Sequence, residues 1–171
     1  MTLNKGRKKS PPYVTYKTFE HFLGRLEQQL PVRIDRSYWG EMFSGSTGMK
    51  LMLALRFLNL IDSNARPMPR LKILVSGITG EHRAVMLRQV AEEAYPFVFR
   101  GKLDIQNTSY AELEEVFQNT YHMKISVCRK CIKFFVEFSK DAVIPLAPQI
   151  TKKRKISHAD HIIKNTNKRF E

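Results

Sequence analysis

The two cysteines are the first residues whose type and spacing suggest chemistry. Cys128 and Cys131 have the C-x-x-C spacing of one half of a structural zinc site. They are the only cysteines in the 171-residue chain, so no second pair of thiolates exists. On a helix both would lie on the same apolar side as Ile132 and Phe135. We therefore expect them to be core residues and not metal ligands.

Two further patterns suggest chemistry and are contradicted by their neighbours. Gly40 and Gly45 have the glycine spacing of a phosphate-binding loop, but Ser46 and Thr47 follow where that loop needs Lys and then Ser or Thr. The group His158-Ala-Asp160-His161 offers metal-binding side chains, but it lies in a tail whose cations disfavour a metal ion. No nucleophile or acid–base motif is recognisable. The sequence predicts a protein that is not an enzyme and that needs no cofactor or metal.

The strongest signal is an excess of positive charge. The chain has 29 Lys and Arg against 16 Asp and Glu, a net charge of +13. Such a charge attracts polyanions such as DNA or RNA. Both ends contribute, because residues 1–10 contain four cations and no acid, and residues 151–171 contain seven cations and two acids. The tails are candidate phosphate-binding arms, with plain solvated ends as the alternative. The cations concerned are Arg7, Lys8, Lys9, Lys152, Lys153, Arg154 and Lys155.

A second basic surface is predicted inside the chain, on a helix that Ser126 is expected to cap. Because successive helical residues turn by 100°, the cations between residues 126 and 140 gather on one side and the large apolar residues on the other. In a helix-turn-helix unit, side chains near the start of the second helix reach phosphates and bases. We expect Ser126, Arg129, Lys130 and Lys133 to do this. The alternative is an ordinary solvated helix face.

Residues 47–61 predict a different kind of helix, which is apolar nearly all round and therefore buried. Ser46 is expected to cap it, so only its first turn would be accessible to nucleic acid, at Thr47 and Lys50. Alternatively, part of its apolar surface contacts another protein or a second copy of the chain. The candidates for such a surface are Trp39, Met49 and Leu53.

The order of elements predicts a mainly α fold of helix-turn-helix or winged-helix type. We expect an amphipathic helix near residues 19–30, with apolar residues at helical spacing, and a short helix near 35–43 that Asp35 can cap. Further helices are expected near residues 47–61, 80–94 and 126–140, and a capping box Ser109-x-x-Glu112 opens another. Residues 70–75 could form a strand or a helix. Two helix-turn-helix segments, each followed by a proline-containing exit, suggest a degenerate tandem duplication. The predicted organisation is a basic disordered arm (1–12), a first helical half (13–100), a second half packed on it (101–150) and a basic tail (151–171).

Several short segments together resemble the prokaryotic domain of unknown function 5343 family. The segments span residues 13–150 and are Tyr13–Phe19, Ile34–Tyr38, Ser44–Gly48, Leu55–Asp62, Pro69–Leu71, Glu93–Phe97 and Ile144–Pro148. The chain departs from that pattern between Asn64 and Met68, in the wing-like turn. The resemblance implies a bacterial or archaeal source and no activity, cofactor or catalytic residue.

Taken together, the residues predict a non-enzymatic nucleic-acid-binding protein, a regulator or accessory factor whose partner is DNA or RNA. The alternative is an interaction adaptor or subunit, with a homodimer or another protein as its partner. No run approaches the roughly 18 apolar residues of a membrane-spanning helix, and no apolar leader is present at the start, so we expect a cytoplasmic, nucleoid-accessible protein with no membrane partner.

Overall fold

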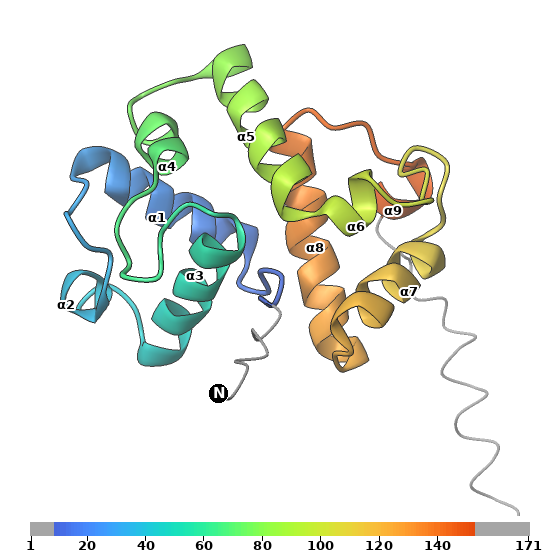
Figure 1. Cartoon of the computed structure of the whole chain (residues 1–171), viewed down its shortest axis with the longest axis horizontal. Coiled ribbons are helices and arrows are strands. Elements are labelled where there is room, and N and C mark those ends of the chain that lie inside the picture. Colours follow the sequence, from blue (N-terminus) through green and yellow to red (C-terminus); the bar gives the residue numbers. More distant parts are fainter. Residues whose placement is uncertain (1–8, 153–171) are drawn as a thin grey trace, which may run out of the picture.

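Residues 9–152 are described by the computed structural model, and this part is built of helices without a strand (Figure 1). The predicted mainly α fold is therefore confirmed. The helices are α1 (Tyr16–Gln28), α2 (Arg36–Trp39), α3 (Gly45–Phe57), α4 (Pro69–Leu74), α5 (Gly80–Ala94), α6 (Pro96–Phe99), α7 (Tyr110–Tyr121), α8 (Ile125–Asp141) and α9 (Pro148–Thr151).

The first two helices begin where a side chain can satisfy a free backbone N–H group. The Thr15 hydroxyl accepts from the N–H of Thr18 at the start of α1, and the Asp35 carboxylate accepts from the N–H of Ser37 at the start of α2. Helix α1 then buries Phe19, Phe22, Leu23 and Leu26 at helical spacing. The predicted amphipathic first helix and the Asp35 cap are confirmed.

Helix α3 begins and ends earlier than the sequence suggests. Its cap is Ser44, whose hydroxyl accepts from the N–H of Thr47, so the prediction of a Ser46 cap is wrong. The helix ends at Phe57 because Asn59 adopts a left-handed conformation (φ 54°) and the N–H of Leu60 turns back to the carbonyl of Leu55. Residues 58–61 are mostly buried but are not helical. Their apolar pattern therefore predicted burial correctly and the end of the helix wrongly.

The ambiguous residues 70–75 belong to helix α4, which has Pro69 at its first position, where a missing N–H costs nothing. The only β pairing in the described range is a single bridge between Ile61 and Pro67. The wing of a winged-helix domain is thus not confirmed, because residues 9–152 contain no two-stranded ribbon that could form it.

In the second half of the chain, the predicted helix start is confirmed at α7 and wrong at α8. The capping box at α7 is complete, since the Ser109 hydroxyl accepts from the N–H of Glu112 and the Glu112 carboxylate accepts from the N–H of Ser109. Helix α8 starts at Ile125 after the turn, and its cap residue, Lys124, makes no side-chain cap bond. The predicted Ser126 cap is therefore wrong, because Ser126 is already the second residue of the helix.

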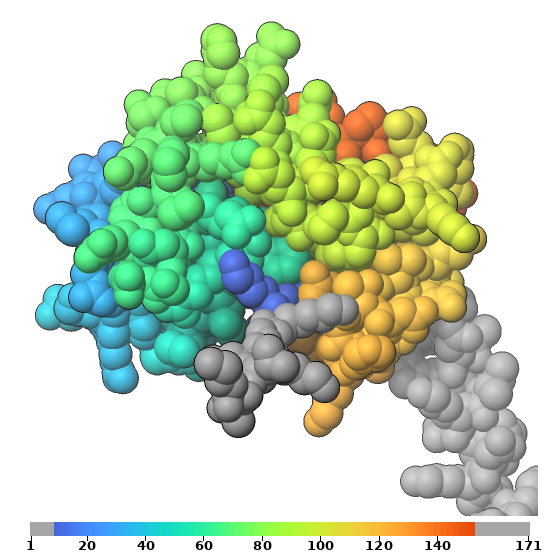
Figure 2. Space-filling model, in the orientation of Figure 1, coloured from blue at the N-terminus to red at the C-terminus, as the bar shows by residue number. Residues whose placement is uncertain are grey.

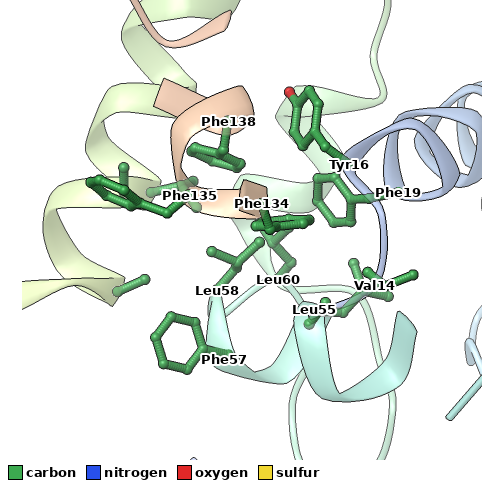
Figure 3. Close-up of a cluster of buried hydrophobic side chains, with 14 of the residues drawn as sticks. Val14, Tyr16, Phe19, Leu55, Phe57, Leu58, Leu60, Phe134, Phe135 and Phe138 are labelled. Atoms are coloured by element: carbon green, nitrogen blue, oxygen red, sulfur yellow. The ribbon is translucent and has the colours of Figure 1, made fainter. Parts of the chain in front are cut away.

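Helix α8 lies at the centre of the molecule and packs against α1, α5 and α7 (Figure 1). Phe134 meets the rings of Tyr16 and Phe19 in α1 (Figure 3). On the other side, Phe135 meets the rings of Tyr95 and Phe117. One continuous hydrophobic core consequently joins the elements before and after α8. This burial fixes the direction in which the remaining side of α8 faces solvent.

Candidate nucleic-acid interface

Helices α7 and α8 follow each other and are joined by three residues, of which His122 is left-handed (φ 50°). The outward side of α8 carries the side chains that the sequence analysis selected. They are Ser126, Arg129, Lys130 and Lys133, which are exposed, as is Lys140 on the same side, and we call these five residues the basic strip. On the opposite side Cys128, Cys131, Ile132, Phe135 and Phe138 are buried. The predicted division of this helix into a basic and an apolar face is confirmed.

Arg129 is not a free cation. Its Nε donates to Glu114 Oε2 of α7 at 3.1 Å, and this carboxylate raises the pKa of the guanidinium. Arg129 is 55% exposed, so the pair is screened by solvent and adds little to stability. Its charge is nevertheless largely offset by Glu114, which weakens the prediction that Arg129 is a main phosphate contact.

Lys130 and Lys133 are exposed and have no ion pair within the described range. Lys124, just before the helix, and Lys140, in its last turn, are also exposed and also have no ion pair within the described range. The half-buried Glu137 lies on the same side of the helix, between Lys133 and Lys140 in the sequence. The structure therefore leaves these four lysines available to an outside anion, and Lys130 and Lys133 are the two that the sequence analysis selected.

Thr47 and Lys50, at the start of α3, are engaged within the fold. The N–H of Thr47 donates to Ser44 Oγ, and the Ser44 hydroxyl in turn donates to Thr47 Oγ1 at 3.1 Å. The ammonium of Lys50 lies 5.5 Å from the centre of the Tyr13 ring, a cation–π contact. Their placement at an accessible nucleic-acid surface is not supported by these contacts.

The start of the described chain runs between α3 and α8. The Lys9 ammonium donates to the carbonyl of Arg56 at 3.4 Å and to Oδ1 of Asn59 at 3.5 Å. Two residues later, the carbonyl of Pro11 accepts from the Cys131 thiol at 3.6 Å. Figure 2 shows these first residues, in dark blue, at the surface between the two sides of the molecule. The root of the N-terminal arm therefore lies against the buried side of α8, opposite the basic strip.

The tails are only partly described. Lys152 is exposed and directly follows α9, on the side of the molecule away from α1 and α3 (Figure 1). The remaining predicted tail contacts lie outside the described residues, namely Arg7, Lys8, Lys153, Arg154 and Lys155. Within residues 9–152 there are 20 Lys and Arg and 14 Asp and Glu, a net charge of +6, so the described part is itself basic.

The sequence analysis missed two hollows that bring distant residues together. A cleft of about 290 Å³, the Lys9–Tyr121 cleft, is lined by Lys9, Phe57, Asn59, Glu93, Ala94, Pro96 and Tyr121. A groove of about 360 Å³, the α2–α3 groove, is lined by Ile34, Asp35, Arg36, Trp39, Gly45, Met49, Met52, Arg56 and Ala65. Both combine residues from separate elements, so no local sequence pattern could have indicated them.

The cysteines have no reactive arrangement. Both are buried, and burial raises the pKa of Cys131 to about 12 and shifts that of Cys128 upwards. Each thiol donates to a backbone carbonyl, Cys128 to that of Glu114 and Cys131 to that of Pro11. Among the described residues, no three His, Cys, Asp or Glu side chains lie together in a metal-binding group.

Comparison with known proteins gave no relative. No protein-family model, no curated protein and no solved structure matches this chain. In the described part of the chain, no helix is long and apolar enough to cross a membrane.

Proposed function

We propose that this protein is a non-enzymatic nucleic-acid-binding protein that holds the phosphates of double-stranded DNA with the basic strip and the basic tails. We place it in the cytoplasm with access to DNA, as a regulator or accessory factor. The resemblance to the family of unknown function is compatible with this role and adds no activity to it.

The observation that carries the proposal is the outward placement of Lys130 and Lys133 on a helix whose other side is buried. A buried α8 cannot turn, so both ammonium groups face solvent from a rigid support. Neither has an acidic partner among the described residues, so a phosphate needs to displace no internal ion pair. Arg129 has a secondary part, because binding a phosphate would compete with Glu114.

The test is the salt dependence of binding to a short random-sequence DNA duplex, followed by fluorescence anisotropy. Each phosphate contact contributes about 0.9 to the slope of log affinity against log salt, so Lys130→Gln with Lys133→Gln should lower that slope by about 2. The matched control is Lys17→Gln with Lys72→Gln, two exposed lysines of α1 and α4 with the same change of net charge. An equal effect of both pairs would show that net charge alone governs binding and would refute a site on α8.

A third variant separates the tail from the helix. Lys153→Gln, Arg154→Gln and Lys155→Gln neutralise the compact cation run of the C-terminal tail in the full-length chain. If only this variant loses binding, the tail is the phosphate-binding arm and α8 needs another role. If the α8 variant and the tail variant each lower the slope, both surfaces contact DNA.

A second candidate function, an interaction adaptor, is favoured by the α2–α3 groove. Met49 is 54% exposed and Leu53 is 37% exposed on the outward side of α3, as the adaptor hypothesis expects. Trp39, in contrast, is only 3% exposed, so the prediction that it belongs to an exposed docking surface is wrong, and it forms part of the groove wall instead. Arg36 and Arg56 also line the groove. This chemistry fits an acidic amphipathic segment of a partner protein, with apolar residues on Met49 and carboxylates on the two arginines.

Methionine methyl resonances test the adaptor. The probes are an acidic amphipathic peptide and a copy of it in which every acid is replaced by lysine, titrated into the full-length protein. The adaptor predicts that the acidic peptide alone shifts the methyl signals of Met49 and Met52. The half-buried Met123, in the turn between α7 and α8, should be unmoved and is the internal control. Shifts with both peptides, or with neither, would rule out this partner chemistry.

A further inference from the structure

The Lys9–Tyr121 cleft lies where four separate elements meet. Phe57 ends α3, Glu93 and Ala94 end α5, Pro96 begins α6, and Tyr121 ends α7. Lys9, the first described residue, also borders it. From its walls we infer that this cleft receives one unpaired nucleobase of the bound nucleic acid. The inference rests on the proposed function, since it names the form of nucleic acid that the protein selects.

The apolar walls provide a surface on which a flat ring can stack. The half-buried Tyr121 ring is held edge-on against Phe97, with 5.2 Å between ring centres, and against Phe57, with 6.2 Å. Pro96 and Ala94 complete the apolar lining. Aromatic side chains fixed in this way stack with any base, and each such contact contributes roughly a 5- to 150-fold gain in affinity.

The polar groups of the cleft match the edge of a base and its phosphate. Asn59 is exposed, and its left-handed backbone at the end of α3 fixes where its amide, which can both donate and accept, is presented. The Lys9 ammonium, 3.5 Å from that amide oxygen, supplies a cation for the phosphate. The Glu93 carboxylate is held by both terminal nitrogens of Arg70, which offsets its charge and reduces its repulsion of a nucleic-acid backbone.

The position of the cleft connects it with the N-terminal arm. Lys9 borders the cleft and directly follows Arg7 and Lys8 in the chain, two cations to which the proposed function assigns phosphates. A strand whose phosphates are held by this arm therefore passes the opening of the cleft. In a fully paired duplex every base is stacked inside the helix, so the cleft gains a base only where one is unpaired.

The experiment compares two DNA probes that differ in one feature, a duplex with a single unpaired adenine bulge and the same duplex without it. Anisotropy with the full-length protein should show at least about 5-fold tighter binding of the bulged duplex. Asn59→Asp keeps the size and turn preference of the residue but replaces the donor with a negative charge. Tyr121→Leu removes the aromatic surface, and its thermal unfolding is measured alongside to establish that it folds.

Both variants should lose the preference for the bulge and keep the affinity for the paired duplex. The matched control is Asn119→Asp, which places the same charge on the exposed side of α7 and outside the cleft, and it should keep the preference. Equal binding of the two probes by the native protein would overturn the base site while leaving the proposed function standing. Binding of neither probe would overturn both.

Discussion

Replacing Gly48 by alanine should destabilise the protein, although alanine is the better helix former. Gly48 lies inside α3, and a Cβ at this position would come within 2.1 Å of two ring carbons of Trp39. The indole cannot move aside freely, because Trp39 is only 3% exposed. Overpacking of this kind costs about 1–3 kcal/mol, and the gain in helix propensity recovers at most about 1 kcal/mol of it. We expect a net loss of about 2 kcal/mol for a contact this short.

Gly24 supplies the matched control because it lies in the interior of α1 and a Cβ there meets nothing within 4 Å. Gly24→Ala should raise the free energy of unfolding by about 0.5–1 kcal/mol. Urea unfolding at neutral pH measures both variants, and a thermal midpoint lowered by roughly 4–8 °C should accompany Gly48→Ala. If Gly48→Ala proved as stable as the native protein, the close packing of Trp39 on α3 would be refuted.

Four further predictions test the core, the thiols and the helix ends. Tyr16→Phe removes a hydroxyl that donates to Asp141 at 2.7 Å, so urea unfolding should show a loss of about 1–2 kcal/mol. Because burial raises the pKa of Cys131 to about 12, a thiol reagent near pH 8 should not label it in the folded protein and should label it in urea. The backbone N–H of the cap residue Ser109 lowers the pKa of Glu112. The Glu112 carboxylate therefore stabilises the fold above its unfolded pKa, and this stabilisation is lost as pH falls through the folded pKa. Glu112→Gln should lower the unfolding free energy at pH 7 and leave it unchanged near about pH 2. Val143, β-branched and 62% exposed at φ 53°, is strained, so Val143→Gly should raise the unfolding free energy by about 0.5–1 kcal/mol.

The fold was predictable where neighbouring residues carry the signal. The Ser109-x-x-Glu112 box and the apolar spacing of α1 are local, and both were confirmed. The Ser44 cap was missed because three serines and threonines within four residues compete for one helix start. The early end of α3 was missed because it depends on a left-handed Asn59, and nothing in its neighbours demands that conformation.

The candidate site was predictable on one helix and not between elements. Helical periodicity alone placed Lys130 and Lys133 on the outward side of α8. It could not show that Glu114 of α7 engages Arg129, or that Tyr13 engages Lys50, because both partners come from other segments. Trp39 was expected to be exposed because no local pattern reveals that Gly48 leaves room for its ring.

The ends of α3 and α8 bear on the duplication hypothesis. In each, the N–H of the residue after the left-handed position bonds to a carbonyl five residues back, Leu60 to Leu55 and Ile144 to Ser139, both at 2.9 Å. Each exit then leads to a short helix with proline at its start, α4 and α9. If the halves are copies, α3 and α8 are counterparts that have diverged in surface chemistry. Helix α3 exposes methionine and leucine beside a groove, and α8 exposes lysines, so the two proposed functions would belong to the two copies of one unit and need not compete.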